Sequence, residues 1–348
     1  MNAPPERLLL RADANPDVGS GHVMRCIALT QAWRAAGHAA TFLSRCPVPA
    51  LVHRMRDTGA EVQLLPELHS PEEETDVLAC VAHDVHATAI ALDGYRFDAA
   101  YQRRAKALGP ALLVIDDYLH AEFYHADIVL NQNLDATQRP YRAAPHARLL
   151  LGPRYVLLRD EFRPYATWRR AIPARAKRIL VTLGGSDPDN VTLRVIQSLA
   201  ASGLSFDVRV VTGGANPHAE ALRAMASPGG IEMLHDVHDM PRLMAWADMA
   251  ISAGGTTCWE MAYMGLPNII LILSENQRDI ARSLEREGVS RCAGDGNALS
   301  DVLLQESLRA LAGDVAARAE MARRGRALVD GHGADRVVEA ILACRPPE

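Results

Sequence analysis

The chain has 348 residues and a formal net charge of −5, with 49% hydrophobic and 5% aromatic residues. This length suits two domains of ordinary size, each able to bury its own core. The charge excludes a general attraction to nucleic acid or an anionic membrane, and the few aromatics argue against a stacking platform for single strands.

In the first half of the chain, short apolar runs alternate with amphipathic stretches, which is typical of parallel α/β domains. Helices are predicted over Met24–Ala36, around Leu51–Arg56 and around Glu72–Ala82. The predicted strands are Leu8–Ala12, Ala40–Ser44, Val62–Leu65, Ala89–Leu92, Ala111–Ile115 and Ile128–Asn131.

This alternation stops in the charged segment 159–170, which contains Pro164, and then starts again. Such a segment indicates a domain boundary. We therefore expect an N-terminal Rossmann-like domain over residues 1–160, a C-terminal one over 161–330 and a last segment over 331–348. In the second domain the predicted elements are a helix over Val191–Ala200 and the strands Arg178–Leu183, Val208–Thr212, Met249–Ser252 and Asn268–Leu273.

The turn after the first strand, Gly19-Ser-Gly21-His22, is the most informative stretch of the chain. Glycines let the backbone approach a ligand closely, and free N–H groups at a helix start favour an anion. Imidazole groups titrate near neutral pH, so a histidine here could move a proton beside a bound phosphate. The turn matches neither the dinucleotide fingerprint nor the phosphate loop of nucleoside triphosphatases. Packing or helix capping is the competing explanation for its residues.

In the second domain, polar turns follow several strands, at the strand ends where ligands bind in such sheets. Thr257 and Glu260 match a capping box, which explains them as well as a ligand would, although a cap does not explain the preceding glycines. Together the turns favour a nucleotide site; its candidate residues are Gly184, Gly185, Ser252, Ala253, Gly254, Gly255, Thr256, Thr257 and Glu260, with Asn276 and Gln277 for a phosphate or sugar.

In the first domain, Asp93 and Tyr95 follow another predicted strand and could reach the neighbourhood of His22. A turn cap and a half-buried aromatic are the alternatives. The similar stretch Asp116-Asp117-Tyr118 follows the next strand, and there we favour a structural role.

The six cysteines show no C-x-x-C pairs, which indicates reduced, mostly buried thiols in a cytoplasmic protein. No metal-ligand spacing occurs, and His235 and His238 are interpreted as a loop pair rather than a zinc site. No secretion leader and no apolar segment of membrane-spanning length is evident. We therefore expect no metal, no cofactor, no nucleic-acid partner and no membrane association. The sequence does not determine the oligomeric state and is consistent with a monomer.

The motifs Arg11-Ala-Asp13, Gly19-Ser-Gly-His22-Val-Met-Arg25, Leu92-Asp-Gly-Tyr95, Leu183-Gly-Gly185, Ser252–Thr257 with Glu260, and Asn276-Gln277 resemble, in order and spacing, the PseG family. That family comprises the UDP-sugar hydrolases of pseudaminic acid biosynthesis. Its motifs overlap with those of MurG-like glycosyltransferases. The resemblance implies a GT-B architecture, two Rossmann-like domains with parallel sheets facing each other across a cleft, and a last helix that packs back on the first domain.

The resemblance also implies metal-independent, inverting hydrolysis of the C1–O bond of a UDP-linked diacetamido-trideoxy sugar. By this likeness His22 is the general base, Glu260 binds the ribose, and residues 252–257 bind the diphosphate side of UDP. Asn276 and Gln277 would contact diphosphate or sugar, and Gly21 would supply N–H groups. Asp13, Arg25, Asp93 and Tyr95 would line the sugar and water pocket.

Two other functions remain open. A glycosyltransferase of the same fold would use the same UDP-sugar donor with an acceptor other than water. A non-catalytic UDP-sugar sensor would bind UDP without turnover and would not depend on His22.

Overall fold

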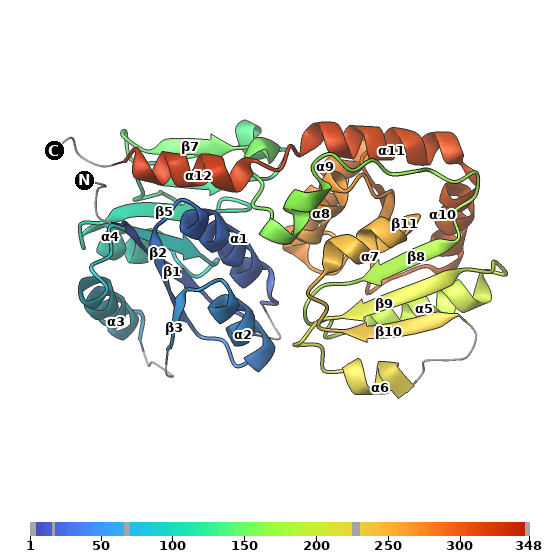
Figure 1. Ribbon diagram of the computed structural model, residues 1–348, viewed down its shortest axis with the longest axis horizontal. Helices are drawn as coiled ribbons and strands as arrows, with labels where there is room; N and C mark the ends of the chain where they lie inside the picture. The colour runs from blue at the N-terminus through green and yellow to red at the C-terminus, as the bar shows by residue number, and fades with distance from the viewer. Residues whose placement is uncertain (1–4, 16–17, 66–69, 225–229, 345–348) are drawn as a thin grey trace. The chain divides into compact units, whose positions relative to one another are not determined.

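The computed structural model describes residues 5–15, 18–65, 70–224 and 230–344. The chain forms two compact units (Figure 1). Unit 1 contains the first strand, residues His22–Asp160 and the chain from His332 onward. Unit 2 contains residues Glu161–Gly331 together with the short stretch 18–21.

Unit 1 is built on a seven-stranded parallel sheet with the order β3-β2-β1-β4-β5-β6-β7. Ala12 of β1 pairs with Asp93 of β4, and Asp93 pairs with Ile115 of β5, so the carboxyl ends of these strands are aligned. Side chains that follow them therefore meet at one edge of the sheet. The strands are β1 (Arg7–Ala12), β2 (Ala39–Ser44), β3 (Glu61–Leu64), β4 (Ala89–Asp93), β5 (Ala111–Ile115), β6 (Ile128–Asn131) and β7 (Arg148–Leu151).

The helices of unit 1 begin at recognisable signals. Ser70 caps α3 by accepting a hydrogen bond from Glu73 N, and Asp98 caps α4 through Tyr101 N. The 3₁₀-helix η2 (Pro153–Tyr155) follows β7. The α-helices are α1 (Gly21–Ala35), α2 (Pro49–Asp57), α3 (Pro71–Asp84), α4 (Ala99–Lys106) and, at the end of the chain, α12 (Gly333–Leu342).

Helix α12 lies beside β7 in unit 1, as Figure 1 shows. Arg148 of β7 donates to the carbonyl of Ala340, and Arg336 of α12 donates to the carbonyl of Arg154. A Cβ at Gly333 would lie 2.2 Å from the carbonyl oxygen of Val156, so only glycine permits this close approach.

Unit 2 repeats the arrangement with a six-stranded parallel sheet in the order β10-β9-β8-β11-β12-β13. The strands are β8 (Arg178–Thr182), β9 (Asp207–Thr212), β10 (Ile231–His235), β11 (Met249–Ala253), β12 (Asn268–Ile272) and β13 (Arg291–Asp295). The helices are α5 (Val191–Ala201), α6 (Ala219–Ala224), α7 (Met240–Trp246), α8 (Thr257–Tyr263), α9 (Arg278–Arg286), α10 (Asp301–Gly313) and α11 (Val315–Leu328).

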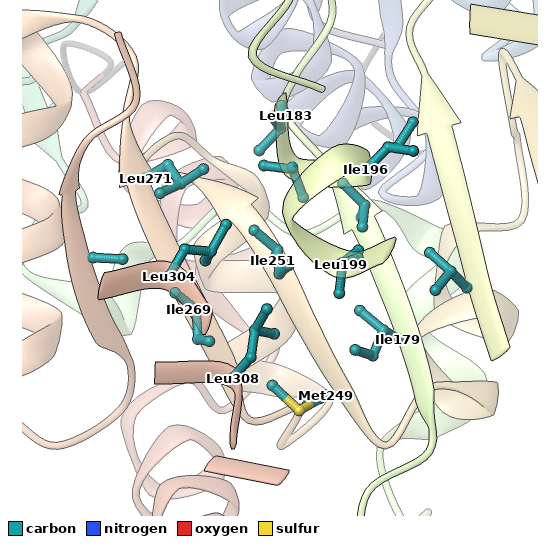
Figure 2. Packing of buried hydrophobic residues seen from close by; sticks show 14 of the residues in the cluster. Ile179, Leu183, Ile196, Leu199, Met249, Ile251, Ile269, Leu271, Leu304 and Leu308 are labelled. Carbon is teal, nitrogen blue, oxygen red and sulfur yellow. The ribbon is translucent and has the colours of Figure 1, made fainter. Parts of the chain in front are cut away.

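The core of unit 2 lies between the sheet and its covering helices (Figure 2). Ile251 and Ile269 project from the central strands β11 and β12, and Leu199 of α5 and Leu308 of α10 pack against this face. All residues of β11 and β12 are buried, which explains their nearly continuous apolar sequences.

The parallel α/β architecture and every strand predicted from the sequence are confirmed, with ends that shift by one residue at most. Helix α1 begins at Gly21 rather than at Met24, so His22 lies in its first turn. The strands β7, β10 and β13 were not predicted.

Candidate functional site

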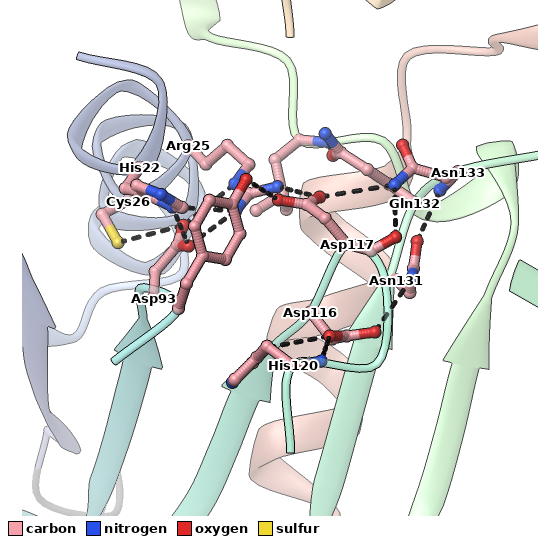
Figure 3. A network of polar contacts seen from close by, with 12 residues as sticks. His22, Arg25, Cys26, Asp93, Asp116, Asp117, His120, Asn131, Gln132 and Asn133 are labelled. Carbon is pink, nitrogen blue, oxygen red and sulfur yellow. Dashed lines mark hydrogen bonds and ion pairs between the residues drawn. The ribbon is translucent and has the colours of Figure 1, made fainter. Parts of the chain in front are cut away.

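The centre of the candidate site in unit 1 is the pair His22 and Asp93 (Figure 3). His22 comes from the first turn of α1, and Asp93 is the last residue of β4. Their side chains meet with Nδ1 of His22 at 2.6 Å from Oδ1 of Asp93. His22 is 5% exposed and Asp93 is fully buried.

This contact fixes the state of the imidazole. An ionised carboxylate can only accept hydrogen bonds, so the 2.6 Å contact requires the proton of His22 to be on Nδ1. Nη2 of Arg25, at 3.1 Å from the same nitrogen, is then a close neighbour and not its donor. The lone pair of neutral His22 is therefore on Nε2, where it can accept a proton.

Arg25 holds this carboxylate in place. Its Nε and Nη2 donate to the two oxygens of Asp93 at 2.9 and 2.6 Å, and its Nη1 donates to Asp117 at 2.6 Å. Burial by itself would raise the pKa of Asp93, but Arg25 and His22 outweigh it and lower that pKa, so Asp93 stays ionised. Because the guanidinium is committed to two carboxylates, the geometry indicates a positioning role for Arg25 rather than the direct substrate contact expected from the sequence.

Tyr95 and Asn133 complete this cluster. Tyr95 OH donates to Asp117 at 2.9 Å, and its ring packs edge-to-face on His22 with centroids 4.7 Å apart. Asn133 Nδ2 donates to the backbone carbonyl of Asp117 at 3.2 Å. Two carboxylates against one guanidinium leave one net negative charge in this cluster while His22 is neutral.

Asp13 belongs to a different cluster. It lies one residue beyond Ala12, the partner of Asp93 in the sheet, but its carboxylate is bonded by Arg11 and Arg96 and by the backbone N–H of Arg45. Burial would raise the pKa of Asp13, but Arg11 lowers it below its usual value. The structure therefore does not join Asp13 to His22; its carboxylate instead links the end of β1 to the segments that follow β2 and β4.

In unit 2, the turn between β11 and α8 differs from a capped helix start. The capping box predicted at Thr257 is wrong, because the helix begins at Thr257 itself and the preceding Thr256 makes no side-chain capping bond. A Cβ at Gly255 would meet nothing within 4 Å. The turn thus presents open backbone to its surroundings, as a bound anion requires.

Gly254 and Gln277 pack closely and are joined by a hydrogen bond. A Cβ at Gly254 would lie 3.0 Å from the backbone oxygen of Gln277, and Gln277 Oε1 accepts from the N–H groups of Gly254 and Leu273 at 3.2 and 3.1 Å. Gln277, expected to contact diphosphate or sugar, therefore uses its oxygen to tie the ends of β11 and β12 together. Its neighbour Asn276 accepts from the hydroxyl of Ser274 at 2.5 Å.

The turn after β8, which holds Gly184 and Gly185, is built differently. Asp187 accepts from the N–H groups of Val191 and Thr192, both at 2.9 Å, so a carboxylate already occupies the start of α5. A Cβ at Gly213 would lie 2.5 Å from the Cα of Gly185. Close packing of two turns therefore accounts for Gly185.

The remaining candidate residues of unit 2 lie where the sequence places them. Ser252 and Ala253 end β11 and are buried, with Ser252 Oγ donating to the Ala253 carbonyl at 3.1 Å. Glu260 lies in the first turn of α8, and Asn276 in the 3₁₀-helix η4 (Glu275–Gln277).

The described part of the chain contains few other features that could form a site. No group of His, Cys, Asp and Glu in it could hold a metal ion, and no helix in it is long and apolar enough to cross a bilayer. Cys26, Cys46 and Cys258 are buried, whereas Cys80 is exposed. A cavity beside Tyr263 is lined by Arg169, Arg323 and Arg326, but Arg326 donates to the carbonyls of Tyr263 and Ala166, which gives it a structural role.

Sequence reasoning missed Asn133 and set Asp117 aside. Both follow neighbouring strands, as the stretches Ile115-Asp-Asp117 and Asn131-Gln-Asn133 show. Polar residues at the ends of adjacent buried strands were the signal that could have identified them, because those ends share one edge of a parallel sheet.

Comparison with known proteins identifies the fold. Residues 178–335 match the glycosyltransferase family 28 C-terminal domain. MurG of Acinetobacter baumannii has a similar structure, with a TM-score of 0.66 at 16% identity over 97% of this chain and all of that one. The two parallel α/β units therefore have the GT-B fold, as expected from the sequence.

Two curated proteins are similar along most of their length. The spore coat polysaccharide biosynthesis protein SpsG of Bacillus subtilis is 27% identical over 338 residues, which cover 95% of this chain and 96% of SpsG. The UDP-2,4-diacetamido-2,4,6-trideoxy-beta-L-altropyranose hydrolase of Campylobacter jejuni is 21% identical over 288 residues, 81% of this chain and 97% of the hydrolase.

Proposed function

We propose that this protein is a UDP-sugar hydrolase in which water, activated by His22, displaces UDP from the sugar. The observation that carries the proposal is the contact between Nδ1 of His22 and the buried carboxylate of Asp93. A carboxylate that fixes the tautomer of a histidine, with the other ring nitrogen available as a base, is the arrangement used by hydrolases of unrelated folds.

In the proposed reaction, the oxygen of water attacks C1 of the sugar while His22 Nε2 takes a proton from that water. A bond forms between C1 and the water oxygen, the bond from C1 to the diphosphate oxygen breaks, and UDP leaves with its electron pair. Attack from the side opposite the leaving group inverts C1. Protonation of His22 neutralises the net negative charge that Asp93, Asp117 and Arg25 leave in the cluster.

The diphosphate is assigned to unit 2. The cluster around His22 has an excess of carboxylates and would repel an anion, whereas the uncapped turn of Gly255, Thr256 and Thr257 offers backbone N–H groups. We assign Glu260, one turn into α8, to the ribose hydroxyls. UDP is a good leaving group, so stabilising its charge and orienting water supply most of the catalysis.

For the sugar we propose UDP-2,4-diacetamido-2,4,6-trideoxy-β-L-altropyranose, whose product would feed pseudaminic acid synthesis. The support is the similarity to the Campylobacter jejuni hydrolase of that name, over 97% of its length, together with the motifs of the same family in this chain. Tyr95, packed on His22 and bonded to Asp117, would face the sugar and the attacking water.

A glycosyltransferase is the second candidate. It is favoured by the match of residues 178–335 to the glycosyltransferase family 28 C-terminal domain. In that case His22 would take its proton from a hydroxyl of an acceptor instead of from water. The two functions differ in one observable, which is turnover without an acceptor.

The test is proton NMR of the purified protein with this UDP-sugar and EDTA, in the absence of any acceptor. The proposal predicts release of UDP and free sugar with the α anomer appearing first, and a loss of about 10³-fold in kcat for His22→Ala. The matched control is His83→Ala, because His83 is an exposed histidine of unit 1 with a weak contact to Asp84. An intact substrate in the wild-type sample would favour the transferase, and an active His22→Ala variant would remove His22 from the mechanism.

A further inference from the structure

A second histidine and aspartate pair lies in the same polar network as the first. His120 Nδ1 is 2.8 Å from Oδ1 of Asp116, and Figure 3 shows this pair below the cluster of His22 and Asp93. The side chains of His120 and Asp116 are 2% and 0% exposed. The proposed reaction gives this pair no role.

The carboxylate of Asp116 accepts several hydrogen bonds. Besides His120 Nδ1, its carboxylate accepts from the N–H groups of Leu119 and His120, from Asn131 Nδ2 at 3.1 Å and from Tyr141 OH at 2.6 Å. Burial alone would raise the pKa of Asp116, but hydrogen bonds from His120 and Tyr141 lower it far below its usual value. An ionised Asp116 requires the proton of His120 to be on Nδ1.

The other ring nitrogen of His120 then carries a lone pair. Nε2 is buried and has no hydrogen-bond partner within the described residues. Leaving a buried acceptor without a partner is energetically unfavourable. Oδ1 of Asn133 is a second buried acceptor in the same network that lacks a partner in the described part of the chain. A buried acceptor without a partner in the protein is accounted for by a bound water or a ligand group that donates a hydrogen bond to it.

The backbone before His120 is strained. Leu119 has φ of +67°, in the left-handed region that is unfavourable for a bulky residue. Asp116 holds this turn closed through Leu119 N. Strain of this kind persists where the surrounding structure enforces it, and here it fixes where the ring of His120 lies.

The ring of Tyr95 links the two histidines. Its centroid is 4.7 Å from that of His22 and 6.3 Å from that of His120. His120 is therefore one aromatic ring away from the proposed base. A sugar that lies beside Tyr95 would therefore also be near His120.

We propose that His120, held by Asp116, is a specificity residue whose Nε2 accepts a hydrogen bond from an N–H or O–H group of the sugar. This inference rests on the proposed function. It assigns recognition of the hydrogen-bond donor group of the sugar to the carboxyl ends of β5 and β6, whereas the diphosphate is assigned to unit 2. The site would discriminate against a sugar that lacks this donor, because such a sugar leaves Nε2 of His120 buried and unpaired.

The test compares the affinities of UDP and of UDP-2,4-diacetamido-2,4,6-trideoxy-β-L-altropyranose by calorimetry, in a His22→Gln background that slows turnover. His120→Asn can keep the donor to Asp116 but lacks an atom at the position of Nε2, whereas His120→Gln can return an acceptor there. We expect His120→Asn to weaken binding of the UDP-sugar about 10-fold and to leave UDP affinity unchanged. His120→Gln should recover most of the loss, and His83→Asn on the exposed surface should show none.

Analogues with O-acetyl in place of each N-acetyl group distinguish the two sources of the donor. If the donor is an amide N–H, one analogue binds the parent about 10-fold more weakly and is insensitive to His120→Asn; if it is a hydroxyl, every analogue keeps the full sensitivity. Equal loss of UDP and UDP-sugar affinity in His120→Asn, or no loss, would overturn this inference alone. Failure of the parent protein to bind UDP and the UDP-sugar would overturn the proposed function as well.

Discussion

Nδ1 of His22 lies 2.6 Å from Oδ1 of Asp93, although 71 positions separate the two residues in the chain. The parallel sheet brings them together, since α1 starts after β1 and Asp93 ends β4, the neighbour of β1. The contact gives a buried histidine one defined tautomer and one nitrogen with which to accept a proton.

Replacing Asp93 by Asn should lower kcat by about 10²- to 10⁴-fold. An amide can donate to Nδ1 and so favour the tautomer with the proton on Nε2, where it blocks the base. UDP affinity should be unchanged, because the diphosphate is assigned to unit 2. Steady-state kinetics and UDP titration check both points. The control is Asp84→Asn, an exposed carboxylate that also contacts a histidine; equal kcat values for the two variants would contradict the role of Asp93.

Replacing Arg25 by Met should destabilise the protein by about 3–5 kcal/mol, because Asp93 and Asp117 would lose their shared cation while staying buried. Burial would lower the pKa of Arg25, but Asp117 and Asp93 raise it well above its usual value, so the native residue is always charged. Urea unfolding measures the effect. Arg103→Met on the exposed surface of α4 should change the unfolding free energy by less than about 0.5 kcal/mol.

The two glycines of the β11–α8 turn should respond differently to alanine. A Cβ at Gly254 would press on the backbone of Gln277, so Gly254→Ala should lower the melting temperature. A Cβ at Gly255 meets open space, so Gly255→Ala should fold normally but weaken UDP binding about 10-fold by displacing the diphosphate from the N–H groups. Thermal melts and UDP titrations distinguish these outcomes, and unchanged UDP affinity in a folded Gly255→Ala protein would remove the diphosphate from this turn.

Acid should destabilise the network in unit 1. The pKa values of Asp93 and Asp116 are lower in the folded protein than the ordinary value of 3.8, so below about pH 5 the unfolded chain binds more protons. The stability from these carboxylates is complete above that pH and is lost as the pH falls through the folded values. Asp116→Asn should therefore be less stable than the parent at pH 7 and lose less on going to pH 3. Unfolding free energies are measured for both proteins between pH 7 and pH 3. An equal loss of unfolding free energy in the two proteins would contradict the link between stability and the ionisation of Asp116.

The alternation of buried strands and helices was enough to predict the interior of both sheets, because strands such as β5 and β12 are continuous apolar runs. The three missed strands, β7, β10 and β13, all lie at sheet edges. In β10 and β13 most residues are only partly buried or exposed, and β7 has two exposed residues of four. With one neighbouring strand instead of two, such segments need no apolar run, and the sequence carries little signal for them.

The candidate site was predictable in part for a similar reason. His22, Asp93 and Tyr95 follow strands whose ends are evident in the sequence, so their place at one edge of the sheet could be expected. What each side chain contacts could not, because those contacts span long distances along the chain, as between Arg25 and Asp117, 92 positions apart. No local sequence pattern predicts that Arg11 and Arg96 hold Asp13, or that Gln277 binds the backbone of Gly254.

The central claim is that water attacks C1 of the sugar. The most direct measurement is hydrolysis of the UDP-sugar in water enriched in ¹⁸O, with no acceptor present, followed by mass spectrometry of both products. Attack at C1 by water predicts one ¹⁸O atom in the free sugar and none in UDP. The label in the diphosphate of UDP, or no products at all, would contradict the account.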